Sequence, residues 1–277
     1  MTAAGGDTRL AATFLDAPHG RLFVLRREPP DGAAPGAQVL IVPPFAEEMN
    51  RSRRLLSELA RELAANGLAV CLPDLTGTGD SEGDFATANW ATWLADVAFL
   101  RRHCRARYAA PLYLLGLRTG ALLAAESVAT QPERVDGLIC VQAVATGDRF
   151  LTQLLRTRVA AAMSRGEKET TKGLRARLDA DEPLTIAGYT LAPALARELA
   201  ARRLDDLPPP ATLPVLWYEV AAPSTEELPS PSPPTSWPRD PMVIRQVRAT
   251  PVWNLQEAEV PRDLIGTITA DCRHGMQ

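Results

Sequence analysis

The sequence lacks a surplus of basic residues, a long apolar run and an export signal. Its 277 residues include 30 Lys and Arg against 33 Asp and Glu, a formal net charge of -3. Because no basic block stands out, we expect no nucleic acid partner. No apolar run approaches the roughly 20 residues that span a bilayer, and residues 1–18 show no signal-peptide pattern. The sequence predicts a cytoplasmic protein that does not span the membrane.

Cysteine is scarce, which argues against a fold held together by disulfides. Of the four cysteines, Cys71 and Cys140 lie in apolar, strand-like runs, where cysteine usually acts as a small buried hydrophobe. Cys104 and Cys272 lie in polar patterns and are predicted to be free. A chain of this size buries a sufficient core without disulfides, so we expect none.

Histidine is scarcer still, which weakens any prediction of metal binding or of acid–base catalysis. The three histidines lie far apart, at His19, His103 and His274. None has a second ligand at a spacing typical of zinc sites. We therefore expect no metal and no cofactor.

Strand-like and helical patterns alternate along most of the chain. The expected strands are a hairpin at 12–27 with an exposed turn at 16–20, followed by 37–42, 68–75, 111–116, 135–141, 213–220 and 242–248. The expected helices are 52–65, 90–102, 119–129 and 255–269. This alternation predicts an α/β fold whose twisted, mostly parallel sheet carries helices on both faces.

Two stretches interrupt the alternation. Residues 150–206 are largely helical and strongly charged, which predicts a helical lid inserted over the carboxyl edge of the sheet. Residues 223–241 are rich in Pro, Ser and Thr and predict a surface loop. We therefore expect one core made of residues 1–149 and 207–277, with the lid between them.

A tight turn joins the expected strand 111–116 to the helix that follows. It reads Gly116-Leu117-Arg118-Thr119-Gly120. An α/β-hydrolase presents its nucleophile on such a turn, in the pattern G-x-S-x-G. Here Arg118 stands at the nucleophile position, and a guanidinium has five N–H donors and no lone pair with which to attack a carbonyl.

A glycine-rich loop strengthens the likeness to α/β-hydrolases. In that family an Asp-x-x-Gly-x-Gly-x-Ser loop precedes the nucleophile helix, and here it reads Asp74, Gly77, Gly79 and Ser81. Together with PPFAEEMNRSRR and GLRTGALLAAE, this loop makes the chain resemble the hydrolases associated with the exosortase A system, type 2. The resemblance covers about residues 13–270. It implies an α/β-hydrolase fold and an association with exopolysaccharide loci and the sorting of PEP-CTERM proteins.

The base that a serine hydrolase needs is also missing. In α/β-hydrolases it follows the last strand, which here is the segment 251–257, and this segment contains no histidine. His274 is expected in a frayed tail, and His103 on the exposed side of a helix. Glu219, at the end of a strand, matches the family's acid most nearly. The sequence thus argues against a conventional Ser-His-Asp enzyme.

Two hydroxyls are weak alternative nucleophiles. Ser81 and Thr119 would each need a base, and Glu47 or Glu48 is the nearest candidate in the expected topology. The simpler interpretation is that Ser81 bonds the backbone of its turn. Thr119, in the same way, is expected to satisfy a free amide at the helix start.

Arg118 has two interpretations. It either points into the pocket beside the free amides of the helix at Thr119 and binds an anion, or it pairs with Glu47, Glu48 or Asp148. Both hold at once if a ligand displaces the carboxylate. An unpaired buried arginine would cost several kcal/mol.

Other residues at the same edge are weaker candidates for ligand contacts. Phe45 stands where a hydrolase supplies an oxyanion amide, or else contacts the lid. Asp148 and Arg149 are expected in a solvated loop. Trp253 and Gln256 occupy the place of the missing base, where Trp253 packs or stacks on a ligand.

Three hypotheses follow from these residues. The first is a hydrolase-fold protein that binds an anionic or acylated small molecule without the Ser-His pair. The second is an active ester or acyl hydrolase, or a transferase, with an unconventional nucleophile. The third is a scaffold that contacts other exopolysaccharide proteins through its lid and its Pro-rich loop.

Overall fold

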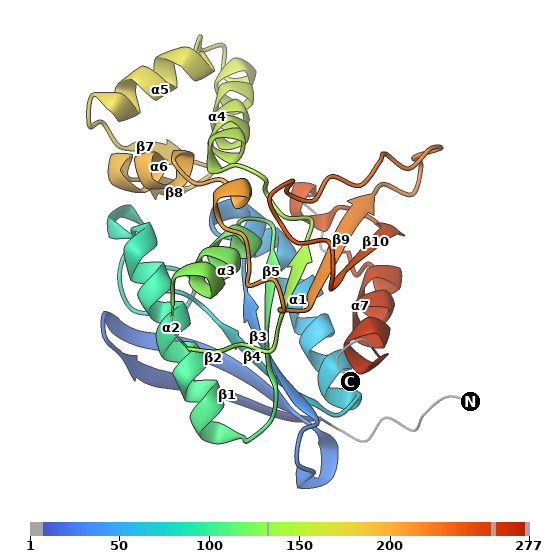
Figure 1. The fold of residues 1–277 in the computed structure, drawn as a ribbon. Coiled ribbons are helices and arrows are strands. Elements are labelled where there is room, and N and C mark those ends of the chain that lie inside the picture. Colours follow the sequence, from blue (N-terminus) through green and yellow to red (C-terminus); the bar gives the residue numbers. More distant parts are fainter. Residues whose placement is uncertain (1–7, 132, 256–258, 275–277) are drawn as a thin grey trace.

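Eight strands form one twisted, mostly parallel sheet in the computed structural model, which describes residues 8–131, 133–255 and 259–274 (Figure 1). The strands are β1 (Arg9–Ala17), β2 (Gly20–Glu28), β3 (Ala37–Val42), β4 (Leu68–Pro73), β5 (Leu112–Leu117), β6 (Gly137–Val141), β9 (Val215–Ala221) and β10 (Met242–Arg248). Their order is β1-β2-β4-β3-β5-β6-β9-β10. Only the β1–β2 and β2–β4 pairs of this sheet are antiparallel. The predicted parallel sheet is confirmed.

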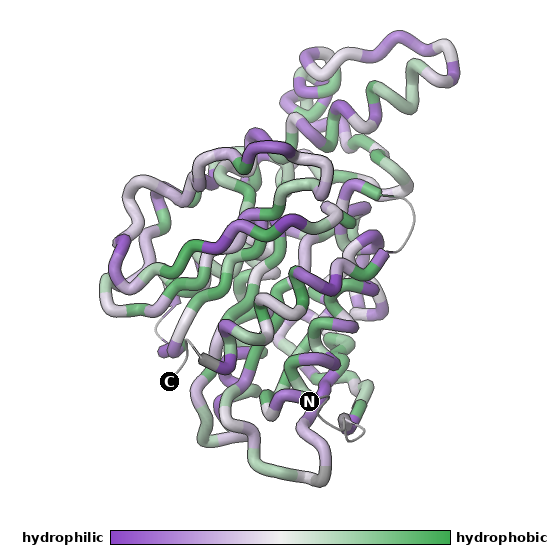
Figure 2. The backbone as a smooth tube through the Cα atoms, turned by 90° about the vertical axis from the view of Figure 1, so that its right-hand side faces the viewer, coloured by the Kyte–Doolittle hydropathy of each residue, from purple (hydrophilic) through white to green (hydrophobic). Residues whose placement is uncertain are grey.

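Helices cover both faces of this sheet, as predicted (Figure 1). One face carries α1 (Ala46–Ala65) and α7 (Arg262–His274), and the other carries α2 (Trp90–Arg107) and α3 (Thr119–Thr130). The inward faces of α1 and α2 carry apolar side chains at helical spacing, and these are buried: Leu55, Leu59, Leu63, Trp93, Val97 and Leu100. Figure 2 shows the strands as the apolar centre of the molecule. No helix in the described ranges is long and apolar enough to cross a bilayer.

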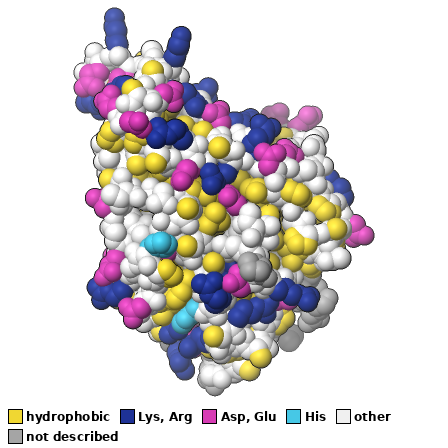
Figure 3. Space-filling model, turned by 60° about the vertical axis from the view of Figure 1, so that its left-hand side comes forward, with side chains coloured by type: hydrophobic (Ala, Val, Ile, Leu, Met, Phe, Trp, Pro, Cys, Tyr) yellow, Lys and Arg dark blue, Asp and Glu magenta, His cyan; other side chains and the backbone are white. Residues whose placement is uncertain are grey.

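A separate layer, the cap (residues 147–200), lies beyond the carboxyl ends of the strands (Figure 1). It contains α4 (Gly147–Ser164), α5 (Thr171–Asp179), β7 (Leu184–Ile186), β8 (Tyr189–Leu191) and α6 (Pro193–Ala200). The hydrogen bonds that join it to the core include one in which Glu198 accepts from the Trp90 amide at 2.7 Å and one in which Asn50 donates to Tyr189 Oη at 2.6 Å. Its tip bears many charged side chains (Figure 3).

The hairpin β7–β8 is an addition to the segment predicted to be largely helical, which does contain the three helices α4, α5 and α6. Its turn is formed by Ala187 (φ 48°) and Gly188 (φ 86°). Positive φ at both central residues is the two-residue turn that matches the twist of paired strands. The sequence Leu184–Leu191 alternates across this turn, so the signal was present but short.

Several boundaries also differ from the predictions. Helix α1 begins at Ala46 and not at residue 52, with Glu47 and Glu48 in its first turn, where the helix dipole favours acidic side chains. Helix α4 begins at Gly147, so Asp148 lies in a helix and not in a loop. Helix α7 covers 262–274 in place of 255–269. His274 is thus its last residue and does not follow it in a tail.

The cysteines and two histidines show which helix faces meet the core. All four cysteines are free, as expected, yet Cys104 and Cys272 are buried because the inward faces of α2 and α7 carry them. His19 is exposed in the β1–β2 turn, as predicted. His103 is half-buried, contrary to the prediction, and burial together with Arg26 and Arg107 lowers its pKa.

The turn between β5 and α3 depends on two glycines. A Cβ at Gly116 would lie 2.3 Å from Ala121 Cα, and one at Gly120 would lie 2.1 Å from Val42 O. The β3 backbone and the turn therefore approach as closely as two chains can. This contact fixes where Arg118 stands relative to β3.

Gly120→Ala tests this close approach. The added methyl would overlap the backbone of β3, which has no rotamer to change, so we expect unfolding to become easier by about 3 kcal/mol. Gly266→Ala in α7 is the matched control, because nothing lies within 4 Å of its Cβ position. That substitution should instead stabilise by up to about 1 kcal/mol. Urea unfolding of both variants measures the difference, and equal midpoints would contradict the assigned packing.

Candidate functional site

The carboxyl ends of three neighbouring strands converge at one edge of the sheet. Val42 of β3 pairs with Gly116 of β5, which in turn pairs with Cys140 of β6. The residues that follow these strands, Phe45, Arg118 and Gln142, therefore share that edge. In open α/β sheets, ligands bind at the carboxyl edge.

Arg118 adopts the strained backbone of a nucleophile turn. Its φ is 57° and its ψ is -119°, a conformation that costs a non-glycine residue about 1–3 kcal/mol. The surrounding backbone holds it, since Arg118 N donates to Val141 O at 3.0 Å and Ala121 N donates to Arg118 O at 3.1 Å. The chain thus keeps the hydrolase turn with arginine in place of serine.

The Arg118 guanidinium is held inside the protein by a carboxylate. Its Nε and Nη2 donate to Glu48 at 3.2 and 2.9 Å, and the two residues are 9% and 7% exposed. Further bonds run from Nη2 to Gln153 of α4 at 3.3 Å and from Nη1 to Gln142 O at 3.4 Å. The paired interpretation is therefore the one that the structure displays.

Glu48 was one of three predicted partners, and the other two are engaged elsewhere. Glu47 pairs with Arg51 at 3.1 Å, and Asp148 pairs with Arg175 at 2.8 Å. Burial raises the pKa of Glu48 above its ordinary value of 4.5, while Arg118 opposes that rise. The ionised carboxylate thus depends on its arginine.

Trp253 occupies the place of the missing base and packs against Arg118. It lies in a short 3-10 helix (Val252–Asn254), 3% exposed, with the guanidinium 5.6 Å from its ring centroid. This is a cation–π contact. Gln256, predicted beside it, lies outside the described residues. The residues that line the clefts around Arg118 include no histidine.

Glu219 lies at the end of β9, where the family's acid was predicted. It accepts from Trp217 Nε1 at 3.0 Å and from Ser232 N at 2.7 Å. Ser232 Oγ is 3.4 Å from the same oxygen, longer than the 2.6–3.2 Å expected of a nucleophile and its base. Glu219 therefore secures the Pro-rich loop.

The two weak nucleophile candidates, Ser81 and Thr119, differ in the hydrogen bonds that their hydroxyls form. Ser81 Oγ donates to Asp74 O at 2.7 Å and accepts from Phe23 N at 2.8 Å, as the simpler interpretation predicted. The expectation for Thr119 was wrong, since its buried hydroxyl bonds no described residue. It stands inside the helix at the first position, one residue past the cap position that bonds amides.

Phe45 contacts the cap, as one of its two interpretations predicted. It is 4% exposed, and its ring lies 5.3 Å from that of Phe150 on α4 and 5.0 Å from that of Trp93. In the described part of the chain, neither Phe45 N nor Thr119 N donates a hydrogen bond. These are the amides that an oxyanion hole would use.

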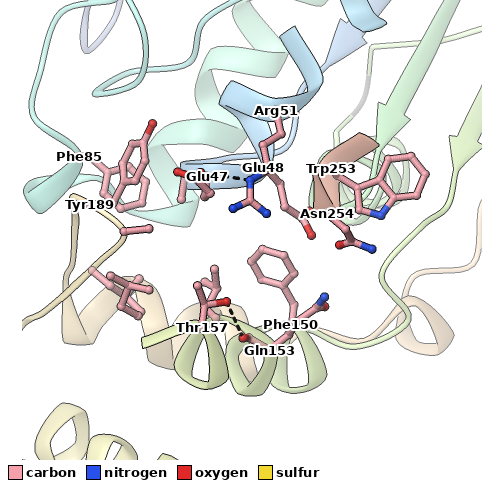
Figure 4. A pocket seen from close by; sticks show the side chains of 15 residues that line it. Glu47, Glu48, Arg51, Phe85, Phe150, Gln153, Thr157, Tyr189, Trp253 and Asn254 are labelled. Carbon is pink, nitrogen blue, oxygen red and sulfur yellow. Dashed lines mark hydrogen bonds and ion pairs between the residues drawn. The ribbon is translucent and has the colours of Figure 1, made fainter. Parts of the chain in front are cut away.

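The first of two clefts, the cap cleft, lies between α1 and α4 and has a volume of about 70 Å³ (Figure 4). Glu47, Glu48 and Arg51 line it from α1, and Gln153 and Thr157 line it from α4. Most of the remaining wall is apolar and comprises Phe85, Phe150, Leu154, Ile186, Tyr189 and Trp253. The cleft therefore offers an apolar space beside a few polar groups.

The second, the arginine cleft, is lined by Arg118 and has a volume of about 530 Å³. It is bounded by α4, the segment after β6 and the Pro-rich loop. Its charged side chains are those of Arg118, Arg149, Arg156 and Glu219. Phe150 and Gln153 line both clefts.

Sequence reasoning missed the part of α4 that reaches the site. Arg149, Gln153 and Arg156 are spaced by four and three residues and so share a helix face. That spacing was available, but the boundary placed at residue 150 hid it. In the described ranges, no group of three His, Cys, Asp or Glu side chains could hold a metal.

The Arg118–Glu48 pair should respond asymmetrically to loss of each partner. Glu48→Gln leaves a guanidinium that cannot lose its charge, so we expect a loss of about 3 kcal/mol at pH 8 that becomes smaller as the pH falls and wild-type Glu48 itself binds a proton. Arg118→Leu leaves a carboxyl whose folded-state pKa is raised further, so it binds a proton. Its native state then binds more protons than the unfolded state, and stability is highest below pH 4.5, the ordinary pKa, and falls as the pH rises.

Urea unfolding between pH 4.5 and 8 measures both effects. The double variant Arg118→Leu, Glu48→Leu is the control, because it removes the titrating carboxyl and should lose the added pH dependence. An Arg118→Leu variant whose stability follows that of the wild type at every pH would contradict the pairing.

Three solved structures show how far the fold is shared. The chain is similar to Est1E from Butyrivibrio proteoclasticus with ferulic acid bound, at 17% identity and a TM-score of 0.65, covering 96% of this chain and 98% of that one. It is also similar to a putative hydrolase from Agrobacterium vitis S4, at 15% identity and a TM-score of 0.61, covering 98% of this chain and 99% of that one. Mouse alpha/beta hydrolase domain-containing protein 10 is similar at 17% identity and a TM-score of 0.54, covering 96% of this chain and 100% of that one. These likenesses confirm the predicted α/β-hydrolase fold.

The family follows from the sequence match. No curated protein matches the chain. The family described as serine aminopeptidase, S33, matches residues 33–202, more than half of the chain. Its nucleophile turn carries Arg118 in place of the serine. Because the family match covers more than half of its length, the chain belongs to the serine aminopeptidase S33 family of α/β-hydrolases.

Proposed function

We propose that this protein binds an acylated or anionic small molecule at the carboxyl edge of its sheet and does not use Ser-His-Asp chemistry there. The observation that carries the proposal is the buried Arg118–Glu48 pair at 2.9 Å. It fills the place where a serine hydroxyl and its base would meet. An arginine has no nucleophilic form at any physiological pH.

The cap cleft supports the binding part of the proposal. Its mostly apolar wall with a few polar groups is typical of sites for small ligands. An acyl chain would lie beside Phe150 and Leu154. Binding would bury apolar surface and so stabilise the folded state.

The resemblance to exosortase A system-associated hydrolases supports a narrower assignment. On that basis the ligand belongs to exopolysaccharide or lipid metabolism and the protein acts in the cytoplasm. The other two hypotheses, an active hydrolase or transferase and a scaffold, are the outcomes against which the proposal is tested.

Restoring serine alone should not restore catalysis. In Arg118→Ser, the new hydroxyl would have no histidine to take its proton, because Trp253 stands in that place. Hydrolysis of p-nitrophenyl acetate and butyrate should equal the wild-type background. Glu48→Gln combined with Arg118→Ser controls for an effect of the freed carboxyl. Turnover by the single variant above that background would revive the hydrolase hypothesis.

Acyl binding to the cap cleft should be visible as a rise in melting temperature. Octanoate at about 100 times its dissociation constant should stabilise the wild type by about 2.7 kcal/mol, a shift of several degrees. Thr157→Trp puts an indole into the cleft and should abolish the shift. Ala160→Trp, exposed on the same helix outside both clefts, should retain it.

Two results would contradict this proposal. One is the absence of any shift with octanoate, octanoyl-CoA and methyl octanoate, which would favour the scaffold hypothesis. The other is an equal shift in the wild type and in Thr157→Trp, which would place the ligand elsewhere.

A further inference from the structure

The cap carries two arginines that differ from its other five. Within residues 147–200, five of the seven arginines form ion pairs: Arg158, Arg165, Arg175, Arg177 and Arg197. Arg149 and Arg156 form none with any described residue, and both line the arginine cleft. Cationic side chains without partners thus gather at one cleft.

These two arginines converge because of helix geometry. Positions 149, 153 and 156 lie on one face of α4, a face that borders the cleft. Gln153 lies between them and accepts from Arg118 Nη2 at 3.3 Å. The turn after β5 and the cap helix therefore direct three guanidinium groups to the same space.

Arg118 retains one donor for that space. A guanidinium has five N–H donors. Nε uses one on Glu48, Nη2 uses two on Glu48 and Gln153, and Nη1 uses one on Gln142 O, which leaves one on Nη1 without a described acceptor. Arg118 is one of the residues that line the cleft.

The opposite wall does not cancel the positive charge. Glu219 is the one carboxylate of the lining, against Arg149 and Arg156, which form no ion pair, and Arg118, whose charge Glu48 already balances. Its Oε1 accepts from Trp217 and Ser232. The remaining lining residues there, such as Pro229 and Ser230, are uncharged. The cleft thus carries two unpaired arginines on its α4 side and one carboxylate opposite, which leaves its lining net positive.

We propose that the arginine cleft binds the phosphate group of a phosphorylated small molecule. The guanidinium fork matches phosphate oxygens bidentately, and several guanidinium groups suit an anion that carries more than one charge. The inference rests on the proposed function, because it assigns the anionic part of that ligand to the arginine cleft and the apolar part to the cap cleft. Phe150 and Gln153, which line both clefts, would lie beside the junction.

Calorimetric titration with inorganic pyrophosphate tests the site at fixed ionic strength. The double variant Arg149→Gln, Arg156→Gln should bind pyrophosphate at least tenfold more weakly than the wild type. The double variant Arg165→Gln, Arg197→Gln loses the same charge from exposed, ion-paired arginines of the cap and should change the affinity less than twofold. An equal loss in both variants, or no binding by the wild type, overturns the inference.

The same variants separate this inference from the proposed function. Octanoate should still bind to Arg149→Gln, Arg156→Gln, because the cap cleft is intact. If octanoate binds and pyrophosphate does not, the phosphate site is wrong and the acyl site stands; the reverse result retains the phosphate site alone. Octyl phosphate and glucose 1-phosphate carry the same group on an apolar and on a polar body, so their relative affinities identify a lipid or a sugar source.

Discussion

The buried ion pair between Arg118 and Glu48 is the constraint on which the rest of the site depends. Two charges removed from water are stable only if each bonds the other and its remaining donors find acceptors. Here the acceptors come from separate elements: Glu48 from α1, Gln142 from the end of β6 and Gln153 from α4. Trp253, which follows β10, packs its ring against the cation. The pair therefore fixes the cap helix to the core as well as filling the nucleophile position.

Retention of the hydrolase turn does not require retention of hydrolase chemistry. Gly116 and Gly120 are needed because the backbone of α3 meets β5 and β3 without room for a Cβ. That requirement comes from packing and applies whichever side chain stands between the two glycines. The strained backbone of Arg118 is held by the same contacts. The membership of the S33 family thus establishes the fold, and the chemistry has to be argued from the side chains.

The sequence was sufficient for the parts of the molecule that repeat a regular pattern. The alternation of strands and helices and the Gly116–Gly120 turn predicted the sheet and the place of Arg118. The choice of Glu48 over Glu47 could not be predicted, because it depends on where α1 begins and so on which side of the helix each carboxylate faces. Asp148 was misplaced for the same reason, since the start of α4 was set three residues too late. The residue at which a helix begins, and with it the direction of each side chain, depends on tertiary contacts. A single sequence does not reveal those contacts.

The same pair also explains why the site is divided in two. Glu48 lines the cap cleft and Arg118 lines the arginine cleft, so the bond between them lies at the boundary of an apolar space and a cationic one. A serine at position 118 would be too short to form such a boundary. A neutral Glu48 would weaken it, and burial already favours the neutral form. The ligand proposed above, with one apolar and one anionic end, would place each end in the environment that suits it, with the ion pair between them.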